Sequence, residues 1–101
     1  MEPLRRFIIR VELHKADATD YQILYDAMKE AEFVKTIKKF NSNNIYKLPE
    51  GEYHYSSKKV IEAKDVLDIA IKAVAKTKKE YQILVTKADG AISFIHLTPD
   101  K

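Results

Sequence analysis

Three histidines are the side chains of this sequence best suited to proton transfer near neutral pH: His14, His54 and His96. Histidine titrates near about pH 6.5, so two imidazoles at a basic surface can divide the general acid and general base of metal-independent RNA cleavage. His14 and His54 share one face of their predicted strands, and we take them as a candidate catalytic pair. The alternative is two solvated histidines at strand ends. His96 has no candidate partner.

The basic residues are concentrated in the middle of the chain. Residues 12–32 hold six carboxylates against two lysines, whereas residues 33–49 hold four lysines and no carboxylate. Aromatic rings on strands stack on the bases of single-stranded RNA, and basic residues among them neutralise its phosphates. We therefore predict an RNA-binding surface next to Tyr53 and His54. Its lysines are Lys35, Lys38, Lys39, Lys47, Lys58 and Lys59. The alternative for Tyr53 and Tyr55 is a place in the core.

Composition excludes several kinds of chemistry. The chain of 101 residues has no cysteine, which excludes disulfides, thiolate metal sites and cysteine nucleophiles. Its two glycines, Gly51 and Gly90, are too far apart for a glycine-rich phosphate loop. The histidines lack metal-ligand spacing, and Asp17 and Asp20 are better explained as helix-capping residues than as Mg²⁺ ligands. We expect no metal and no small-molecule cofactor.

Apolar periodicity predicts an alternation of strands and helices. Residues 5–14 alternate with period two, as in a strand with one buried face. A helix capped by Asp17 or Thr19 follows and ends near residue 31, and an amphipathic helix spans about 62–77. The chain between them predicts strands over 33–40, 45–48 and 52–57, the first two joined by a turn at 41–44. The last predicted strands, 81–86 and 91–97, flank an Asp89-Gly90 turn.

This order predicts one α+β domain over residues 1–101. It matches the ferredoxin-like split βαβ arrangement, with an inserted hairpin and an extra C-terminal β-strand. The open face of the sheet and the C-terminal strand offer an apolar surface and a sheet edge, so we expect a homodimer. No apolar run is long enough for a membrane span or a secretory signal, so we expect a cytoplasmic protein. The predicted core comprises Phe7, Ile9, Val11, Leu13, Leu24, Met28, Val66, Ile71 and Val74.

One further pattern lies within residues 7–75: Met28, Phe33, Ile37, a polar turn, Lys47-Leu48, Tyr53 and Ser56-Ser57 come before an acidic amphipathic helix. The spacing of these residues resembles that of the GhoS-type antitoxin endoribonucleases, small ferredoxin-like domains related in fold to the Cas2 nucleases. The resemblance implies an antitoxin that cleaves the messenger of a membrane toxin. It also implies that Tyr53, at the position of a functional aromatic residue of that family, is a third candidate catalytic residue. Tyr25 stands where that family has a helix-one arginine, and His14 replaces an aspartate of Cas2-like proteins.

Two functions follow as expectations. The first is an RNA-binding protein with antitoxin-type endoribonuclease activity on single-stranded RNA. The second is a non-catalytic, homodimeric module that binds RNA or a protein.

Overall fold

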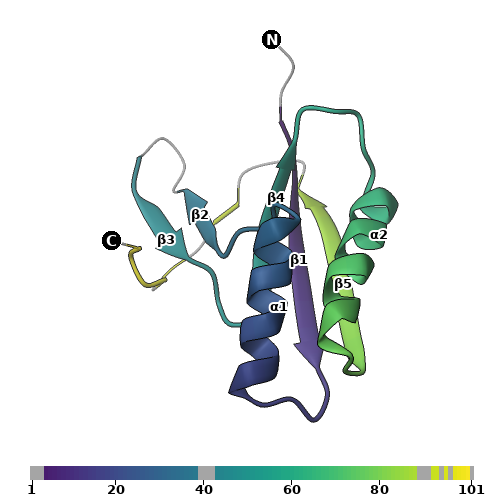
Figure 1. Cartoon of the computed structure of the whole chain (residues 1–101). Coiled ribbons are helices and arrows are strands. Elements are labelled where there is room, and N and C mark those ends of the chain that lie inside the picture. The colour runs from purple at the N-terminus through teal and green to yellow at the C-terminus, as the bar shows by residue number, and fades with distance from the viewer. Residues whose placement is uncertain (1–3, 39–42, 89–91, 94, 96, 101) are drawn as a thin grey trace.

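The computed structural model describes residues 4–38, 43–88, 92–93, 95 and 97–100. These residues form a small α+β structure with two helices, a three-stranded antiparallel sheet and a two-stranded hairpin (Figure 1). The elements in chain order are β1 (Arg5–Leu13), α1 (Ala18–Glu30), β2 (Thr36–Lys38), β3 (Ile45–Lys47), β4 (Glu52–Ser57), α2 (Ala63–Val74), a single 3₁₀ turn (Ala75–Thr77) and β5 (Tyr81–Ala88).

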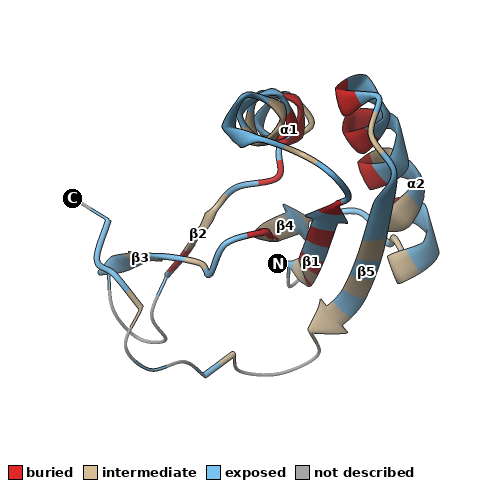
Figure 2. Ribbon diagram, turned by 90° about the horizontal axis from the view of Figure 1, so that it is seen from below, coloured by how far each residue is buried: buried red, intermediate tan, exposed pale blue. Residues whose placement is uncertain are grey.

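The larger sheet has the order β4-β1-β5, with β1 antiparallel to both neighbours. Its register places Ile8 opposite His54 on one side and opposite Thr86 on the other. Directly opposite residues point to the same face of a sheet, so these three side chains share one face. Both helices cover the other face, as Figure 2 shows from below. The odd-numbered residues of β1 point towards the helices and are buried, as their alternation predicts.

The core lies between the sheet and the two helices. Eight of the nine predicted core residues are buried, and Phe33 and Tyr53 join them. The prediction that Ile71 is buried is wrong, because its exposed fraction is 36%. The buried face of α2 runs through positions 66, 70, 73 and 74. Ile71 lies about 100° around the helix from Ala70 and therefore falls outside that face.

Residues 33–38 do not form the continuous strand predicted for 33–40. Val34 makes an isolated bridge with His54, with its N–H donating to the His54 carbonyl at 2.9 Å and the His54 N–H donating back at 2.7 Å. The chain then leaves β4 at a bend and pairs as β2 with β3 in a separate sheet. Residues 41 and 42 of the turn predicted at 41–44 lie outside the described residues. The outer edge of β4 is therefore covered only in part by the described chain.

The strand predicted over 91–97 is wrong for the described residues of that range, none of which is in a strand. The chain instead reaches β3, where Pro99 bridges Tyr46 and the Lys47 N–H donates to the Thr98 carbonyl at 2.8 Å. A hairpin of three-residue strands is weak alone, and this tail adds a third segment to it. The Asp89-Gly90 turn lies outside the described residues. The outer edge of β5 has no paired strand among the residues described.

Both helices begin with a carboxylate that accepts a hydrogen bond from a backbone N–H, and at α1 the bonds are reciprocal. The Asp20 N–H donates to the Asp17 Oδ1 at 2.9 Å, and the Asp17 N–H donates to the Asp20 Oδ2 at 3.0 Å, which confirms Asp17 as the cap. The Glu62 N–H donates to the Asp65 Oδ2 at 2.9 Å at the start of α2. Within the described residues, neither helix combines the length and apolarity needed to cross a membrane.

Candidate functional site

The sheet register separates the two histidines of the candidate catalytic pair. His54 lies opposite Ile8, whereas His14 follows the other end of β1, where its N–H donates to the Glu80 carbonyl at 2.8 Å. Positions 8 to 14 span about 20 Å of extended chain, at about 3.3 Å per residue. The expected approach of His14 to His54 is therefore wrong. Because the β1–β4 pairing already ends at Arg10 and Glu52, His14 extends beyond β4.

The two central tyrosines of β4 belong to the core side of the sheet. Tyr53 is 2% exposed, and Tyr55 is half-buried with its ring centroid 4.9 Å from that of Phe33. The core alternative from the sequence is thus confirmed for Tyr53. Tyr53 and His54 point to opposite faces of the sheet, because successive strand residues alternate. Neighbours in sequence, they cannot act together on one substrate group.

The predicted RNA-binding lysines lie on three different surfaces. Lys35 is half-buried at the bend before β2, and Lys38 and Lys47 are exposed on the hairpin. The hairpin register pairs Lys38 with Ile45 and Thr36 with Lys47, so the two lysines are diagonal neighbours on one face, about 7–8 Å apart. Lys58 and Lys59 are exposed beyond the end of β4. Lys39 lies outside the described residues.

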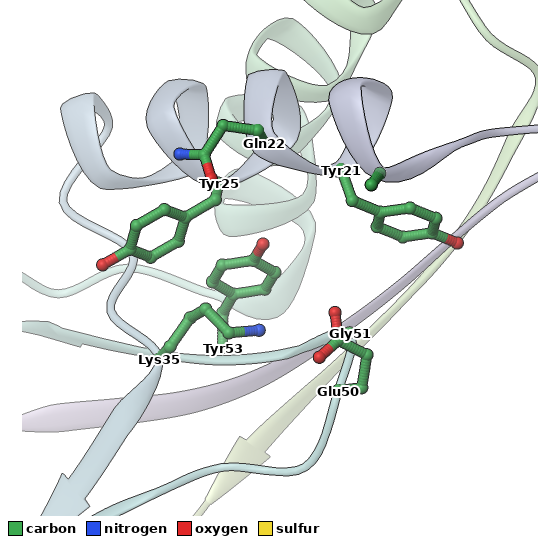
Figure 3. Close-up of a pocket in the computed structure, with 8 residues that line it drawn as sticks. Tyr21, Gln22, Tyr25, Lys35, Glu50, Gly51 and Tyr53 are labelled. Atoms are coloured by element: carbon green, nitrogen blue, oxygen red, sulfur yellow. The ribbon is translucent and has the colours of Figure 1, made fainter. Parts of the chain in front are cut away.

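A groove of about 640 Å³ opens between α1 and β4 (Figure 3). Tyr21, Gln22 and Tyr25 form its α1 wall, and Tyr53 rises from β4 between the two tyrosines of the helix. The remaining lining residues are Ala18, Lys35, Glu50 and Gly51. The groove lies where the bend at Lys35 carries the chain away from β4 towards β2. Its volume is typical of sites that hold a small molecule or one nucleotide.

Two short segments position the charged residues of this groove. Lys35 lies between Val34, which is bonded to β4, and β2; its carbonyl accepts the Leu48 N–H at 2.8 Å. Glu50 lies between Pro49 and Gly51, in the turn after β3. Gly51 has a φ of +83°, and a Cβ on it would lie 2.8 Å from the Val11 carbonyl oxygen. Only glycine fits this close approach, which places Glu50 at the groove.

The groove contains one ammonium, that of Lys35, and one exposed carboxylate, that of Glu50. The Lys35 Nζ lies 4.8 Å from the centre of the Tyr53 ring, within cation–π range. Neither Lys35 nor Glu50 is in an ion pair with a described residue. Burial raises the pKa of the Tyr53 phenol, and the negative charge of the Glu50 carboxylate raises it further by a smaller amount. The Tyr53 hydroxyl therefore stays protonated near neutral pH and cannot serve as a base.

Tyr21 and Gln22 have their polar groups engaged within the protein. The Tyr21 hydroxyl lies 3.3 Å from the Leu13 nitrogen and 3.4 Å from the Leu13 oxygen. The Gln22 Nε2 donates to the Asp26 Oδ1 at 3.0 Å. A ligand would therefore find aromatic surface at α1 and two charged groups, Lys35 and Glu50, on the strand side (Figure 3).

Sequence reasoning missed Glu50 as a site residue and placed Tyr21 and Tyr25 only on a buried helix face. One signal was present: two tyrosines at the (i, i+4) spacing of a single helix face. The other was the Pro49-Glu50-Gly51 turn directly before a tyrosine-rich strand. Nothing in the sequence indicated that these two segments meet.

On the opposite face of the sheet, His54 has a buried side-chain nitrogen. Its Nε2 has no hydrogen-bond partner among the described residues. Burial, with a smaller contribution from the charge of Arg6, lowers the pKa of His54 from its usual 6.5. The neutral imidazole is thus the form that the folded protein favours, which suits packing better than proton transfer.

We expect this buried imidazole to make stability depend on pH. The unfolded chain binds a proton at His54 near 6.5, but the folded chain does so only at lower pH. The contribution of the neutral His54 imidazole to stability is therefore fully present above pH 6.5, the usual value, and is lost as the pH falls towards the lower pKa of the folded protein. Urea unfolding from about pH 7 to about pH 5, above most carboxyl titration, should show a smaller loss for His54→Gln than for the parent. His14→Gln, at an exposed position, is the control, and an equal loss in all three proteins would contradict the expectation.

Comparison with protein-family models, with curated proteins and with solved structures found no match to this chain. The fold and the groove define a small α+β protein with a tyrosine-lined groove at the base of a basic hairpin.

Proposed function

We propose that this protein binds single-stranded RNA, with one unstacked base in the tyrosine-lined groove and the neighbouring phosphates on the hairpin lysines. The observation that carries the proposal is the position of the groove at the base of the hairpin. Lys35 lies immediately before β2 and Glu50 lies three residues after β3, so both strands of the hairpin lead into the groove. An aromatic groove continuous with a basic surface is suited to a flexible, charged polymer of bases.

The energetics of the groove favour a base over an aliphatic group. Stacking of a base on an aromatic side chain contributes about 1–3 kcal/mol and tolerates any sequence. Tyr21 and Tyr25 are half-buried, so their rings are held in place and still partly accessible. Lys38 and Lys47 lie close together with like charge, and neither is in an ion pair with a described residue. A phosphate near them removes that repulsion.

The separation of His14 from His54 supports binding without cleavage by this pair. An antitoxin-type endoribonuclease, as in GhoS-type proteins, stays a prediction that needs other catalytic groups. We also propose that the protein acts in the cytoplasm.

We also propose that the fold is a ferredoxin-like variant in which the second strand of the split βαβ arrangement is shortened. The order β4-β1-β5 agrees with the first, third and fourth strands of the split βαβ arrangement, with both helices on one face. The bridge of Val34 with His54 occupies the position of the remaining strand. This interpretation supports the proposed relationship to GhoS-type proteins.

Homodimerisation also stays a prediction. The outer edge of β5 is the one that a second copy would extend, since it spans eight residues and carries Leu84 at 64% exposure. Sedimentation at micromolar concentration tests it, and a single 11.7 kDa species would argue against it.

Incubation of the protein with single-stranded RNA at low salt, with and without a chelator, tests the proposed function. We expect a shift in fluorescence anisotropy of the labelled RNA and intact RNA on a denaturing gel in both conditions. Absence of binding at low salt would refute the proposal. Binding with cleavage would support the endoribonuclease alternative, and His14→Ala and His54→Ala variants would show whether the histidines contribute.

A further inference from the structure

Lys35 and Glu50 both line the strand side of the groove, with the Lys35 ammonium over the Tyr53 ring. Figure 3 shows the Lys35 ammonium and the Glu50 carboxylate both directed towards the middle of the groove, beside Tyr53. They are not an ion pair with each other. Each therefore keeps hydrogen-bonding capacity: the ammonium donates only, and the carboxylate accepts only.

This pair of groups selects among the four bases by hydrogen-bonding pattern. The Watson–Crick edge of guanine presents an acceptor, O6, followed by two adjacent donors, N1–H and the N2 amino group. Adenine and cytosine place a ring-nitrogen acceptor beside their single amino group, which repels the second carboxylate oxygen. Uracil has one N–H between two carbonyl oxygens. A donor beside a carboxylate therefore complements guanine at three positions and each other base at fewer.

We infer that the groove prefers guanine, with Glu50 accepting from N1–H and the N2 amino group and Lys35 donating to O6. This inference rests on the proposed function and adds the base to it. The rings of α1 supply the stacking surface. The tight turn at Gly51 fixes the backbone of Glu50 relative to β1, and the Glu50 side chain lines the groove. Glu50 is then a specificity-determining residue and Lys35 its partner.

The test measures the affinity of short single-stranded oligonucleotides that differ at one central base. Guanosine, inosine, adenosine, cytidine and uridine are compared; inosine lacks the N2 amino group of guanosine. We expect guanosine to bind on the order of tenfold more tightly than adenosine, since hydrogen bonds to charged groups are among the stronger ones. Inosine should fall between them. Glu50→Gln should reduce the preference to within about twofold, by the same conversion.

Glu52→Gln provides the matched control. Glu52 is two residues away and pairs with Arg10, so its side chain lies on the other face of the sheet. This variant removes the same charge and should retain the preference for guanosine. Binding of all five oligonucleotides with equal affinity would overturn the inference and leave the proposed function intact. A preference that survives Glu50→Gln would also overturn it. Failure of every oligonucleotide to bind would overturn the proposed function itself.

Discussion

Replacement of Leu24 by alanine is expected to lower the free energy of unfolding by about 2–5 kcal/mol. Leu24 is fully buried in the middle of α1, where it contributes to the cluster that joins both helices to the sheet. Alanine removes buried methyl groups and leaves a cavity, because neighbouring side chains relax only in part. Urea unfolding followed by circular dichroism measures the change through the midpoint and the slope.

Ile23→Ala is the matched control for this prediction. Ile23 precedes Leu24 in the same helix but is 41% exposed, whereas Leu24 is 0% exposed, so truncation at position 23 removes much less buried apolar surface. We expect the loss at position 23 to be well below that at position 24. Similar losses for the two variants, or a loss below about 1 kcal/mol for Leu24→Ala, would place α1 in a different orientation from the one described.

The double substitution Lys38→Glu with Lys47→Glu is expected to weaken binding of single-stranded RNA by at least an order of magnitude at low salt. Both side chains lie on the exposed face of the hairpin, and the substitutions change its charge from attractive to repulsive. Each neutralised phosphate on a single strand contributes about 0.7 to the slope of log affinity against log salt. The slope should therefore fall by about 1.4 if each lysine contacts one phosphate. Fluorescence anisotropy over a series of salt concentrations measures both quantities.

Lys64→Glu with Lys72→Glu provides the equal change in net charge on α2. These lysines are exposed and lie on a helix distant in sequence from the hairpin. Their reversal should alter affinity much less and leave the salt dependence close to that of the parent. An equal effect of the two pairs would mean that RNA responds to net charge alone, and would contradict a binding surface on the hairpin.

The sequence by itself determined the elements whose patterns are local. β1 alternates with period two over nine residues, and α1 and α2 have helical apolar stripes with caps at their starts. Each pattern is complete within its own segment, because the backbone geometry repeats over two or about 3.6 residues. The bounds of β4 were predicted at 52–57, as observed. Most of the core could also be predicted, because the apolar face of a long periodic strand or helix must be buried for the chain to fold.

Tertiary structure alone decided where separate segments meet. The pairing of His54 with Ile8, and not with a residue near His14, depends on the register of β1 against β4. Strand alternation assigns a residue to a face and carries no information about its position along the neighbouring strand. Alternation also could not decide the role of Tyr53, because a tyrosine that packs in the core and a tyrosine that stacks on an RNA base have the same pattern in the sequence. Ile71 differs from Ala70 by one step around α2, so only the packed orientation of the helix separates them.

The groove depends most strongly on tertiary structure. It exists because the chain after Val34 leaves the edge of β4, and because the turn at Gly51 packs against Val11. Residues 33–40 have strand-forming side chains, but their pairing partner is set by competition between β4 and β3. Residues 91–97 likewise have strand propensity, yet the described part of that range forms no strand and the tail pairs with β3. Propensity describes a single segment, and pairing is a property of two, so the site that pairing creates was absent from the sequence pattern.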